Sequence, residues 1–399
     1  MINNFSADAV SEKPSRRVLI VVRRLKTGGI EKATLNLASG LISQGHAAHV
    51  LLLKGSNQLP LPDGVVLHSC NISKLLRKDA FGLFVYILSR LLLRLLIPGS
   101  AFVWEGWLYS RILHQYVHEI ESRHGEFDLV LLRGQGVFES VWNFKHPNLW
   151  QVVEGPPLSF HGHPFARWFY RLLYKQKQIV TVSEGIGAVL QSELSAYGVT
   201  VKRAEVIHNL LPLAEIRRLA AEQPDDLPAG AYILHVGRLA PVKNQALLLD
   251  AYAASGLTMP LVIVGDGGER RALQERAKTL GISDKVLFLA EKQNPYCYMA
   301  NAKVFVLSSR MEGFGLVLVE SLACGTQVVA TDVPGGIREV LIGEQTRLLA
   351  ENSIAGLAAK MREAVEFPVT VDPAWAERFA PEQIVPKFLQ LILTKQEEK

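Results

Sequence analysis

Two cations and two carboxylates stand at defined spacings in the second half of the chain. Arg238 follows an apolar run, Lys243 opens the next helical pattern, and Glu312 and Glu320 are eight residues apart. Two cations beside a helix N-terminus can bind a diphosphate, because the helix dipole and the free N–H groups add to their charge. The pattern indicates a diphosphate site, although taken alone the two cations also fit solvated surface charges.

The spacing of the two carboxylates helps to distinguish between classes of ligand and reaction. If residues 316–323 are helical, Glu312 and Glu320 lie roughly 10 Å apart along the helix axis. That is long for the ~5 Å pair of a retaining glycosidase and marginal for an inverting one. It suits a nucleotide-sugar, with one carboxylate on sugar hydroxyls, the other on ribose hydroxyls and the helix N-terminus on the diphosphate. Gly313 and Gly315 would let the backbone approach the ligand.

Other glycine-rich turns follow apolar runs. Gly28 and Gly29 precede a helical pattern, where bare backbone suits a phosphate or a sugar. The segments VGDGGER (264–270) and PGG (334–336) are similar, but the first lacks the full GxGxxG spacing. Each of these also fits an ordinary tight turn. The chain has no Walker motif, which argues against a kinase or an ATPase.

The candidate residues can form one site only if the strands that precede them end side by side in a sheet. Apolar runs predict strands at 17–22, 48–53, 128–132, 149–153 and 179–182, and again at 232–236, 261–264, 286–289, 304–307, 327–330 and 347–349. Helical patterns alternate with most of them, and the Pro-rich segment 210–230 reads as a linker. The sequence therefore predicts an α/β protein of two Rossmann-like, doubly wound parallel-sheet domains facing a cleft. We expect domains at 1–209 and 210–375, and a C-terminal helix at 376–399 that returns to the first domain.

Composition excludes several classes of protein. The chain has 399 residues, 49% of them hydrophobic and 20% charged, which excludes whole-chain disorder and a coiled coil. Its three cysteines form no CxxC pair, so a disulfide framework or zinc ribbon is not expected and a reducing cytoplasm fits. The first fifteen residues lack the apolar core of a signal peptide. Residues 1–209 carry 23 Lys and Arg against 15 Asp and Glu, whereas residues 210–399 carry 20 against 23.

Taken together, these segments resemble the retaining nucleotide-sugar glycosyltransferases of glycosyltransferase family 4, of the bacterial surface-polysaccharide type, which have the GT-B fold. The matching segments cover the second half almost continuously and the first half in patches: TGGIEKATLNLA (27–38), VIHNLLP (206–212), HVGRLAPVKN (235–244), VIVGDGGER (262–270), EGFGLVLVE (312–320) and ACGTQVVATDVPGGIREV (323–340). Their combined order is specific, whereas each piece alone is not.

The resemblance implies roles for single residues. Arg238 and Lys243 would hold the donor diphosphate, Glu312 would touch donor-sugar hydroxyls, and Glu320 would bind the ribose. The remaining donor-binding positions are Gly28, Gly29, Gly313, Phe314, Gly315, Leu316 and Val317. The first domain would lie on the acceptor side and the second would bind the donor. The family needs no metal, and no DxD triplet is present to hold one, so neither a metal nor a cofactor is expected.

One position departs from the family pattern. Many members have a histidine after the strand that here reads 150–153, where it contacts the donor sugar. This chain has Glu154 there. Either Glu154 takes that role, or His161 or His163 in the following loop does, and Glu154 is favoured. Glu154 also fits a structural carboxylate at a domain edge.

Two basic stretches are rich in leucine and aromatic residues. Residues 74–94 have no uncharged run near the ~20 residues of a membrane span. Residues 165–177 place Arg167, Arg171 and Lys175 on one helical face. Such segments can lie in an anionic headgroup layer, and a lipid-linked acceptor would make this useful. The alternative is that their apolar faces pack on the sheet.

The sequence thus predicts a cytoplasmic, membrane-peripheral hexosyl- or N-acetylhexosaminyl-transferase. It would act with retention on a growing glycan, such as lipopolysaccharide or a lipid-linked glycan. A nicotinamide-dependent oxidoreductase is the first rival, against which the missing GxGxxG counts. A non-catalytic sugar- or nucleic-acid-binding protein is the second. No nucleic-acid partner is expected, because no nucleic-acid motif accompanies the charge.

Overall fold

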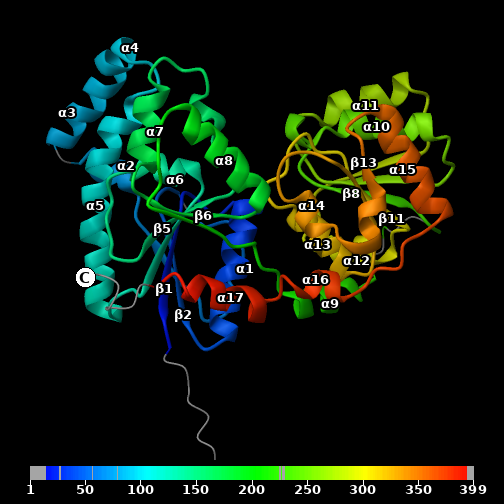
Figure 1. Ribbon diagram of the computed structural model, residues 1–399, viewed down its shortest axis with the longest axis horizontal. Coiled ribbons are helices and arrows are strands. Elements are labelled where there is room, and N and C mark those ends of the chain that lie inside the picture. Colours follow the sequence, from blue (N-terminus) through cyan, green and yellow to red (C-terminus); the bar gives the residue numbers. More distant parts are fainter. Residues whose placement is uncertain are drawn as a thin grey trace, which may run out of the picture.

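The protein folds into two lobes, each built around a parallel sheet (Figure 1). The computed structural model describes residues 15–26, 28–55, 57–78, 80–223, 226 and 230–392, without the side chains of 92–94 and 158. The seven-stranded sheet has the order β3-β2-β1-β4-β5-β6-β7, and the six-stranded sheet has the order β10-β9-β8-β11-β12-β13. The prediction of two Rossmann-like α/β units is confirmed.

The N-terminal lobe holds the seven-stranded sheet. Its strands are β1 (Arg17–Val22), β2 (Ala47–Leu52), β3 (Val66–Ser69), β4 (Leu129–Arg133), β5 (Leu149–Val153), β6 (Gln178–Thr181) and β7 (Arg203–Val206). Its helices are α1 (Gly29–Ser43), α2 (Ile72–Leu76), α3 (Ala80–Leu88), the π-helix η1 (Ser89–Leu93), α4 (Arg94–Leu96), α5 (Ala101–His124), α6 (Gln135–Ser140), η2 (Leu158–Phe160), α7 (Ala166–Tyr174) and α8 (Glu184–Ala196).

The C-terminal lobe holds the six-stranded sheet. Its strands are β8 (Ile233–Val236), β9 (Leu261–Val264), β10 (Val286–Leu289), β11 (Val304–Leu307), β12 (Val328–Thr331) and β13 (Leu349–Ala350). Its helical segments are α9 (Leu213–Ala220), η3 (Pro241–Lys243), α10 (Gln245–Ser255), α11 (Arg270–Thr279), α12 (Tyr296–Asn301), α13 (Leu316–Ala323), α14 (Ile337–Val340), η4 (Gly343–Leu348), α15 (Ile354–Glu366) and α16 (Ala374–Glu377), and α17 (Pro381–Leu389) follows.

The strand predictions hold where a strand is buried on both faces. β4, β9 and β11 consist of buried residues only, as continuous apolar runs require. The edge strand β3 was missed, because its sequence VLHS is half exposed and carries no apolar run. The strand expected at 347–349 was misplaced: a 3-10 helix occupies Gly343–Leu348, and β13 has only two residues.

The last helix joins the two lobes. α17 packs against α1, and the Trp150 indole N–H donates to the Leu391 carbonyl oxygen at 3.3 Å. One apolar core runs through residues of both sheets and includes Phe379 and Phe388 of the C-terminal segment. We propose domain boundaries after residues 209 and 375 on the basis of this sheet membership.

The two basic stretches differ in how they pack. In α7, Phe169, Tyr170 and Leu173 are fully buried, whereas Arg167 and Arg171 are exposed. For Phe169 and Tyr170 the structure therefore favours the second alternative, in which the apolar face of this helix packs inside the protein. In α3, by contrast, only Gly82 is buried. Among the described residues, no helix has both the length and the apolar character needed to cross a membrane.

Candidate active site

Lys243 and Glu312 meet at the carboxyl ends of two neighbouring strands. β8 and β11 pair in parallel, and the segments after them carry Lys243 and Glu312 respectively. Lys243 Nζ lies 2.6 Å from Glu312 Oε2, and the Ser309 hydroxyl donates to the same oxygen at 3.2 Å. The side chains are 23% and 14% exposed, so the pair is accessible to a ligand. An anionic ligand could replace Glu312 as the ion-pair partner of Lys243. The Glu312 carboxylate could then accept hydrogen bonds from hydroxyl groups of the ligand.

The N-terminus of α13 lies directly after Glu312. Gly315 is its N-cap with φ +90°, a conformation that favours glycine. The first turn leaves the N–H groups of Leu316 and Val317 without intrahelical acceptors. The Phe314 side chain does not reach toward a ligand, since it is buried against His208 and Phe379. What this turn can offer is therefore backbone N–H groups for an anion.

Gly313 lies where the two lobes come into close contact. A Cβ built on it would come 2.0 Å from the Glu154 carbonyl oxygen, so no larger residue fits without moving the backbone. The Ser183 hydroxyl of the N-terminal lobe donates to the Gly313 carbonyl at 2.7 Å. The lobes are thus in contact at the position where the sequence predicts the donor sugar.

Glu320 is engaged by the opposite lobe. Its side chain is 5% exposed, and Lys32 Nζ of α1 lies 2.6 Å from its Oε1. The same ammonium group lies 4.9 Å from the centre of the Tyr296 ring. Burial lowers the pKa of Lys32, but the Glu320 carboxylate more than offsets this and holds the pKa above its usual value. The carboxylate expected to bind a ribose therefore forms an ion pair between the lobes.

Glu154 is held by a buried arginine. Arg133, at the end of β4, donates through Nε to Glu154 Oε1 at 2.7 Å and through Nη2 to Asn209 Oδ1 at 2.6 Å. The Asn209 amide donates to Glu154 Oε2 at 3.2 Å. Arg133 is 2% exposed, so the charge of Glu154 is balanced inside the protein.

Glu31 is influenced electrostatically by Arg238 of the other lobe and by Glu154 of this cluster. Burial raises the pKa of Glu31, the nearby Glu154 raises it further, and Arg238 of the other lobe opposes the increase. Arg238 is exposed and forms no ion pair within the described part of the chain. Gly28 is the N-cap of α1, and Gly29 has open space where a Cβ would be. Thr27 lies outside the described residues.

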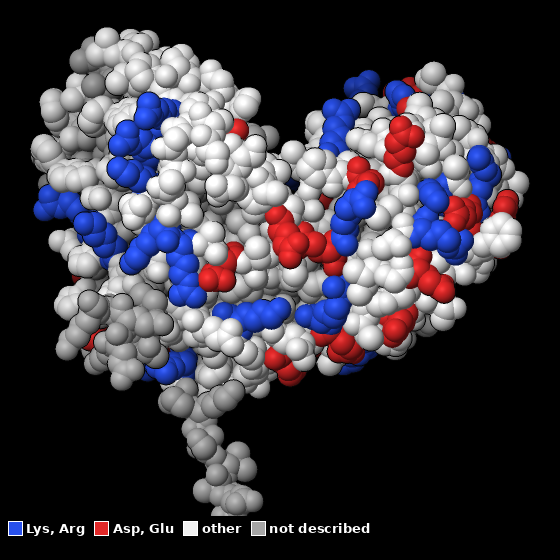
Figure 2. All heavy atoms as spheres, in the orientation of Figure 1, with Lys and Arg blue, Asp and Glu red and all other residues white. Residues whose placement is uncertain are grey.

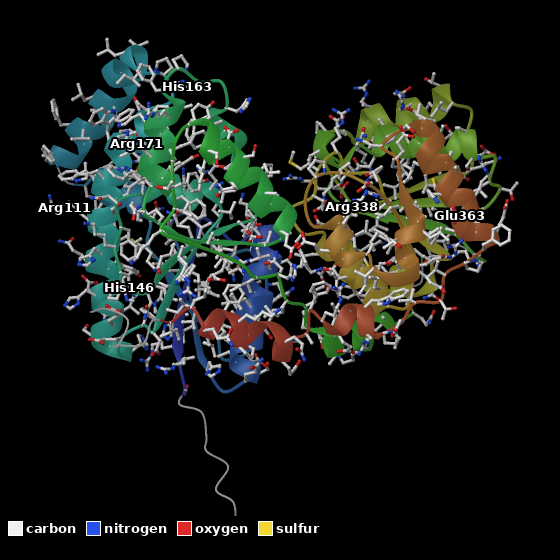
Figure 3. The ribbon with its side chains drawn as sticks, in the orientation of Figure 1. Arg111, His146, His163, Arg171, Arg338 and Glu363 are labelled. Atoms are coloured by element: carbon white, nitrogen blue, oxygen red, sulfur yellow. The ribbon has the colours of Figure 1, made fainter. Side chains whose placement is uncertain are left out.

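The two loop histidines lie elsewhere. His161 Nδ1 is 2.9 Å from Glu193 Oε2 on α8, and His163 Nδ1 accepts from the Phe165 N–H at 3.1 Å. Figure 3 shows His163 at the outer end of the N-terminal lobe. The structure shows no contact of either histidine with the Glu154 cluster or with Glu312 among the residues it describes.

A further contact joins the lobes at the N-terminus of α8. The Glu184 and Gly185 N–H groups donate to the Glu339 carboxylate at 2.8 and 3.0 Å, and His208 Nε2 lies 2.8 Å from Glu339 Oε2. Burial by itself raises the pKa of Glu339, but these hydrogen bonds outweigh it and lower the pKa. Glu339 therefore acts as an interlobe cap for α8.

Sequence reasoning missed two residues that act across the lobes, Lys32 and Glu339 as a partner of α8. It also missed Arg133 and Asn209, which hold Glu154 within the N-terminal lobe. A signal existed for Arg133, because a charged residue at the end of an otherwise apolar strand usually faces a site at the carboxyl edge of the sheet. Lys32 lies one helical turn after Gly28 and Gly29, which places it near the carboxyl edge of the same sheet.

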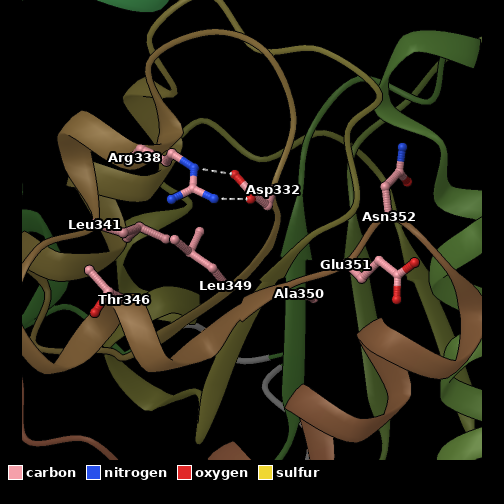
Figure 4. Close-up of a pocket in the computed structure, with 8 residues that line it drawn as sticks. All are labelled: Asp332, Arg338, Leu341, Thr346, Leu349, Ala350, Glu351 and Asn352. Atoms are coloured by element: carbon pink, nitrogen blue, oxygen red, sulfur yellow. Dashed lines mark hydrogen bonds and ion pairs between the residues drawn. The ribbon is translucent and has the colours of Figure 1, made fainter.

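A surface pocket of about 450 Å³ is formed at the ends of β12 and β13 (Figure 4). Its lining includes Asp332, Arg338, Thr346 and Glu351, and Arg338 Nε donates to Asp332 at 2.8 Å. It contains none of the residues predicted to bind a donor. Within the described ranges, no cluster of His, Cys, Asp and Glu could hold a metal ion.

Residues in the C-terminal half of the chain match a known protein family. Residues 222–374 match the family described as "Glycosyl transferases group 1". A Campylobacter jejuni N-acetylgalactosamine-N,N'-diacetylbacillosaminyl-diphospho-undecaprenol 4-alpha-N-acetylgalactosaminyltransferase is 39% identical over 162 residues, which are 41% of this chain and 44% of the relative. The Rhizobium meliloti lipopolysaccharide core biosynthesis glycosyltransferase LpsE is 30% identical over 45% of this chain and 54% of its own. The chain thus spans about half of these relatives.

Solved structures match over nearly the whole chain. Anabaena HepE in complex with UDP superposes with a TM-score of 0.67 at 19% identity, over 94% of this chain and 98% of that one. The lipopolysaccharide outer core galactosyltransferase WaaB gives a TM-score of 0.59 at 17% identity, over 94% and 99%. At such identities the likeness concerns the fold. Residues 222–374 thus match the group 1 glycosyltransferases, and the two-sheet architecture matches that of solved glycosyltransferases with the GT-B fold.

Proposed function

We propose that the protein is a retaining glycosyltransferase that moves a sugar from a nucleoside-diphosphate donor to a growing glycan. The observation that carries this proposal is the Lys243–Glu312 pair beside the N-terminus of α13. The cation and the free backbone N–H groups can bind a diphosphate. The carboxylate can accept hydrogen bonds from the hydroxyl groups of the attached sugar. A site for a nicotinamide dinucleotide would need the GxGxxG turn that the chain lacks.

The donor diphosphate is assigned to Arg238, Lys243 and the α13 amides. Arg238 has no internal ion pair in the described residues, so its charge is available to a phosphate. As the bond to the sugar breaks, negative charge grows on the leaving diphosphate, and preorganised cations stabilise that charge. HepE has been crystallised with UDP, which supports a nucleoside diphosphate as the ligand class. The nucleobase is left open.

The donor sugar is assigned to Glu312, with Glu154 as a second contact. Arg133 and Asn209 fix the orientation of the Glu154 carboxylate. We therefore propose that Glu154 accepts a hydrogen bond from the donor sugar and does not act as a nucleophile. Glu320 is assigned to the ribose, which requires that hydroxyl groups compete with Lys32 for the carboxylate. His161 and His163 are kept as acceptor-side candidates on the outer loop.

The acceptor is proposed to be lipopolysaccharide or a lipid-linked glycan. Support comes from the names of relatives, one acting on a diphospho-undecaprenol and one in lipopolysaccharide core biosynthesis. The same names favour a hexosyl or N-acetylhexosaminyl group as the transferred sugar. We place the reaction at the inner face of the cytoplasmic membrane, without a metal or a cofactor.

A ligand-stabilisation screen tests the function. The purified protein is heated with UDP-, GDP- and ADP-sugars, and in parallel with NAD and NADP. A matching donor at 100 times its Kd should stabilise the fold by about 2.7 kcal/mol. Stabilisation by a dinucleotide with no effect of any sugar nucleotide would favour the oxidoreductase instead.

A further inference from the structure

A stripe of exposed apolar side chains runs along α3, η1 and α4 at the outer end of the N-terminal lobe (Figure 1). It consists of Phe81, Phe84, Ile87, Leu91, Leu95 and Leu96, which we call the apolar ridge. Their exposed fractions range from 46% at Ile87 to 78% at Leu95. The spacing of three or four residues from Phe81 to Leu95 places these side chains on one side of the helical stretch.

The helical segments that carry the ridge pack on the rest of the lobe by their opposite side, which leaves the ridge exposed. α3 and η1 pack on α5, and Gly82 provides the close approach of α3 to Leu76, whose carbonyl oxygen would lie 2.3 Å from a Cβ there. Single exposed leucines are common on protein surfaces, but a contiguous apolar patch marks an interaction site.

Cations flank the ridge. From Cys70 to Glu105 the sequence has five cations, Lys74, Arg77, Lys78, Arg90 and Arg94, against two acids, Asp79 and Glu105. Arg90 is paired within the protein, since its Nε lies 3.0 Å from Glu105 Oε1. The Arg77 and Arg90 guanidinium groups lie 5.7 and 4.5 Å from the centre of the Tyr86 ring, which holds both beside the ridge.

The positive charge extends to neighbouring loops. Partial burial, and then the repulsion of Arg23, Arg24, Arg90 and Arg77 in that order, lowers the pKa of Lys54. The exposed cations of α7 add a further group, visible in blue in Figure 2 beside the white surface over α3 and α4.

We propose that the apolar ridge inserts into the interface of an anionic lipid bilayer, with Arg77 beside the lipid phosphates. An apolar stripe flanked by cations fits such an interface, and the long cationic side chains can reach the headgroups while the leucines enter the acyl layer. A second copy of the chain is a poorer occupant, because its own cations would be brought against these.

The position of the ridge agrees with the proposed function. In Figure 1, α4 stands at the top of the N-terminal lobe, and in Figure 2 the notch between the lobes opens at the same end of the molecule. If the acceptor is lipid-linked, which rests on the proposed function, docking by the ridge turns the notch toward the bilayer. The docking itself can be tested without any enzymatic assay.

Vesicle co-sedimentation of the full chain tests the proposal. The vesicles are phosphatidylcholine alone or phosphatidylcholine mixed with phosphatidylglycerol, at low and high salt. We expect binding to rise with phosphatidylglycerol and to fall, but not vanish, at high salt, because apolar insertion is not screened. The double substitution Phe84→Ser and Leu95→Ser should lower the partition coefficient on the order of 100-fold.

Matched variants separate the contributions. Arg77→Glu with Lys74→Glu should weaken the phosphatidylglycerol dependence. Ile354→Ser with Phe367→Ser, at exposed apolar positions of the other lobe, should leave partitioning unchanged. Partitioning of the ridge variant equal to that of the unaltered chain would overturn the proposal. Light scattering could also overturn it. If the unaltered chain forms a dimer without lipid and the ridge variant does not, the ridge is an interface between two copies of the chain.

Discussion

Replacing Lys32 by methionine should weaken the contact between the lobes. The substitution removes the ammonium group that lies 2.6 Å from Glu320 and keeps most of the apolar stem beside Tyr296. Breaking a fully buried ion pair by removing one partner costs about 3–5 kcal/mol, whereas an exposed pair contributes ~0.2–1 kcal/mol. Glu320 is 5% exposed but Lys32 is 38% exposed, so water can replace part of the lost interaction. We expect a loss of about 2 kcal/mol in the free energy of unfolding.

A double-mutant cycle measures this interaction. Lys32→Met, Glu320→Gln and the double variant are unfolded in urea and by heat, and the single variants should lower Tm by roughly 4–8 °C. The double variant should be less destabilised than the sum of the single ones, with an interaction energy of about 1–2 kcal/mol. Lys278→Met is the control, because Lys278 and Glu275 form an ion pair at 2.8 Å in which both side chains are more than 60% exposed. It should cost less than about 0.5 kcal/mol. An interaction energy below that value for Lys32 and Glu320 would refute the interlobe role of the pair.

Three further outcomes are expected. Glu312→Gln should lower donor use about 10–100-fold while the protein stays folded, because it removes a charge-assisted hydrogen bond to a hydroxyl; initial rates check this. Arg238→Ala and Lys243→Ala should lower kcat more than they raise the donor KM, since their charge acts mainly on the leaving diphosphate. The stabilisation by Glu339 should be present above about pH 4.5 and be lost as the pH falls through its lowered folded-state pKa, so unfolding of Glu339→Gln should depend less on pH between about 3 and 5.

Each of these has a contradicting result. Full transfer activity of Glu312→Gln would mean that the donor-sugar site is misplaced. An unchanged kcat with a raised KM in both alanine variants would mean that the cations only bind the donor. If Glu339→Gln and the unaltered chain lose stability in parallel as the medium is acidified, the carboxylate does not cap α8 across the lobes.

The juxtaposition of Lys243 and Glu312 could be predicted because it depends on strand order alone. Both residues follow the carboxyl ends of parallel strands, and such ends meet at one edge of a sheet. The pairing of Arg133 with Glu154 has the same origin, since β4 and β5 are neighbours, but the sequence analysis did not follow the charged end of that strand. Lys32 and Glu320 are different, because their contact depends on the orientation of two separate sheets.

Amphipathic patterns did not reveal what their apolar faces contact. The stretches at 74–94 and 165–177 look alike as sequence, yet Phe169 of α7 is fully buried and Phe84 of α3 is 60% exposed. Helical periodicity shows which residues share a face, whereas the neighbouring element decides whether that face is covered. α7 packs into the core of the N-terminal lobe, whereas the side chains of the apolar ridge are exposed on α3, η1 and α4.

Donor binding by the Lys243–Glu312 site is tested most directly by titration calorimetry with sugar nucleotides. UDP-, GDP- and ADP-sugars are titrated into the unaltered chain, into Glu312→Gln and into Glu366→Gln, a control at an exposed glutamate away from the site. The proposed function predicts that one sugar nucleotide binds the unaltered chain and the Glu366→Gln control alike, and binds Glu312→Gln about 10-fold or more weakly. Equal affinity of all three proteins for that donor would contradict the assignment of the site.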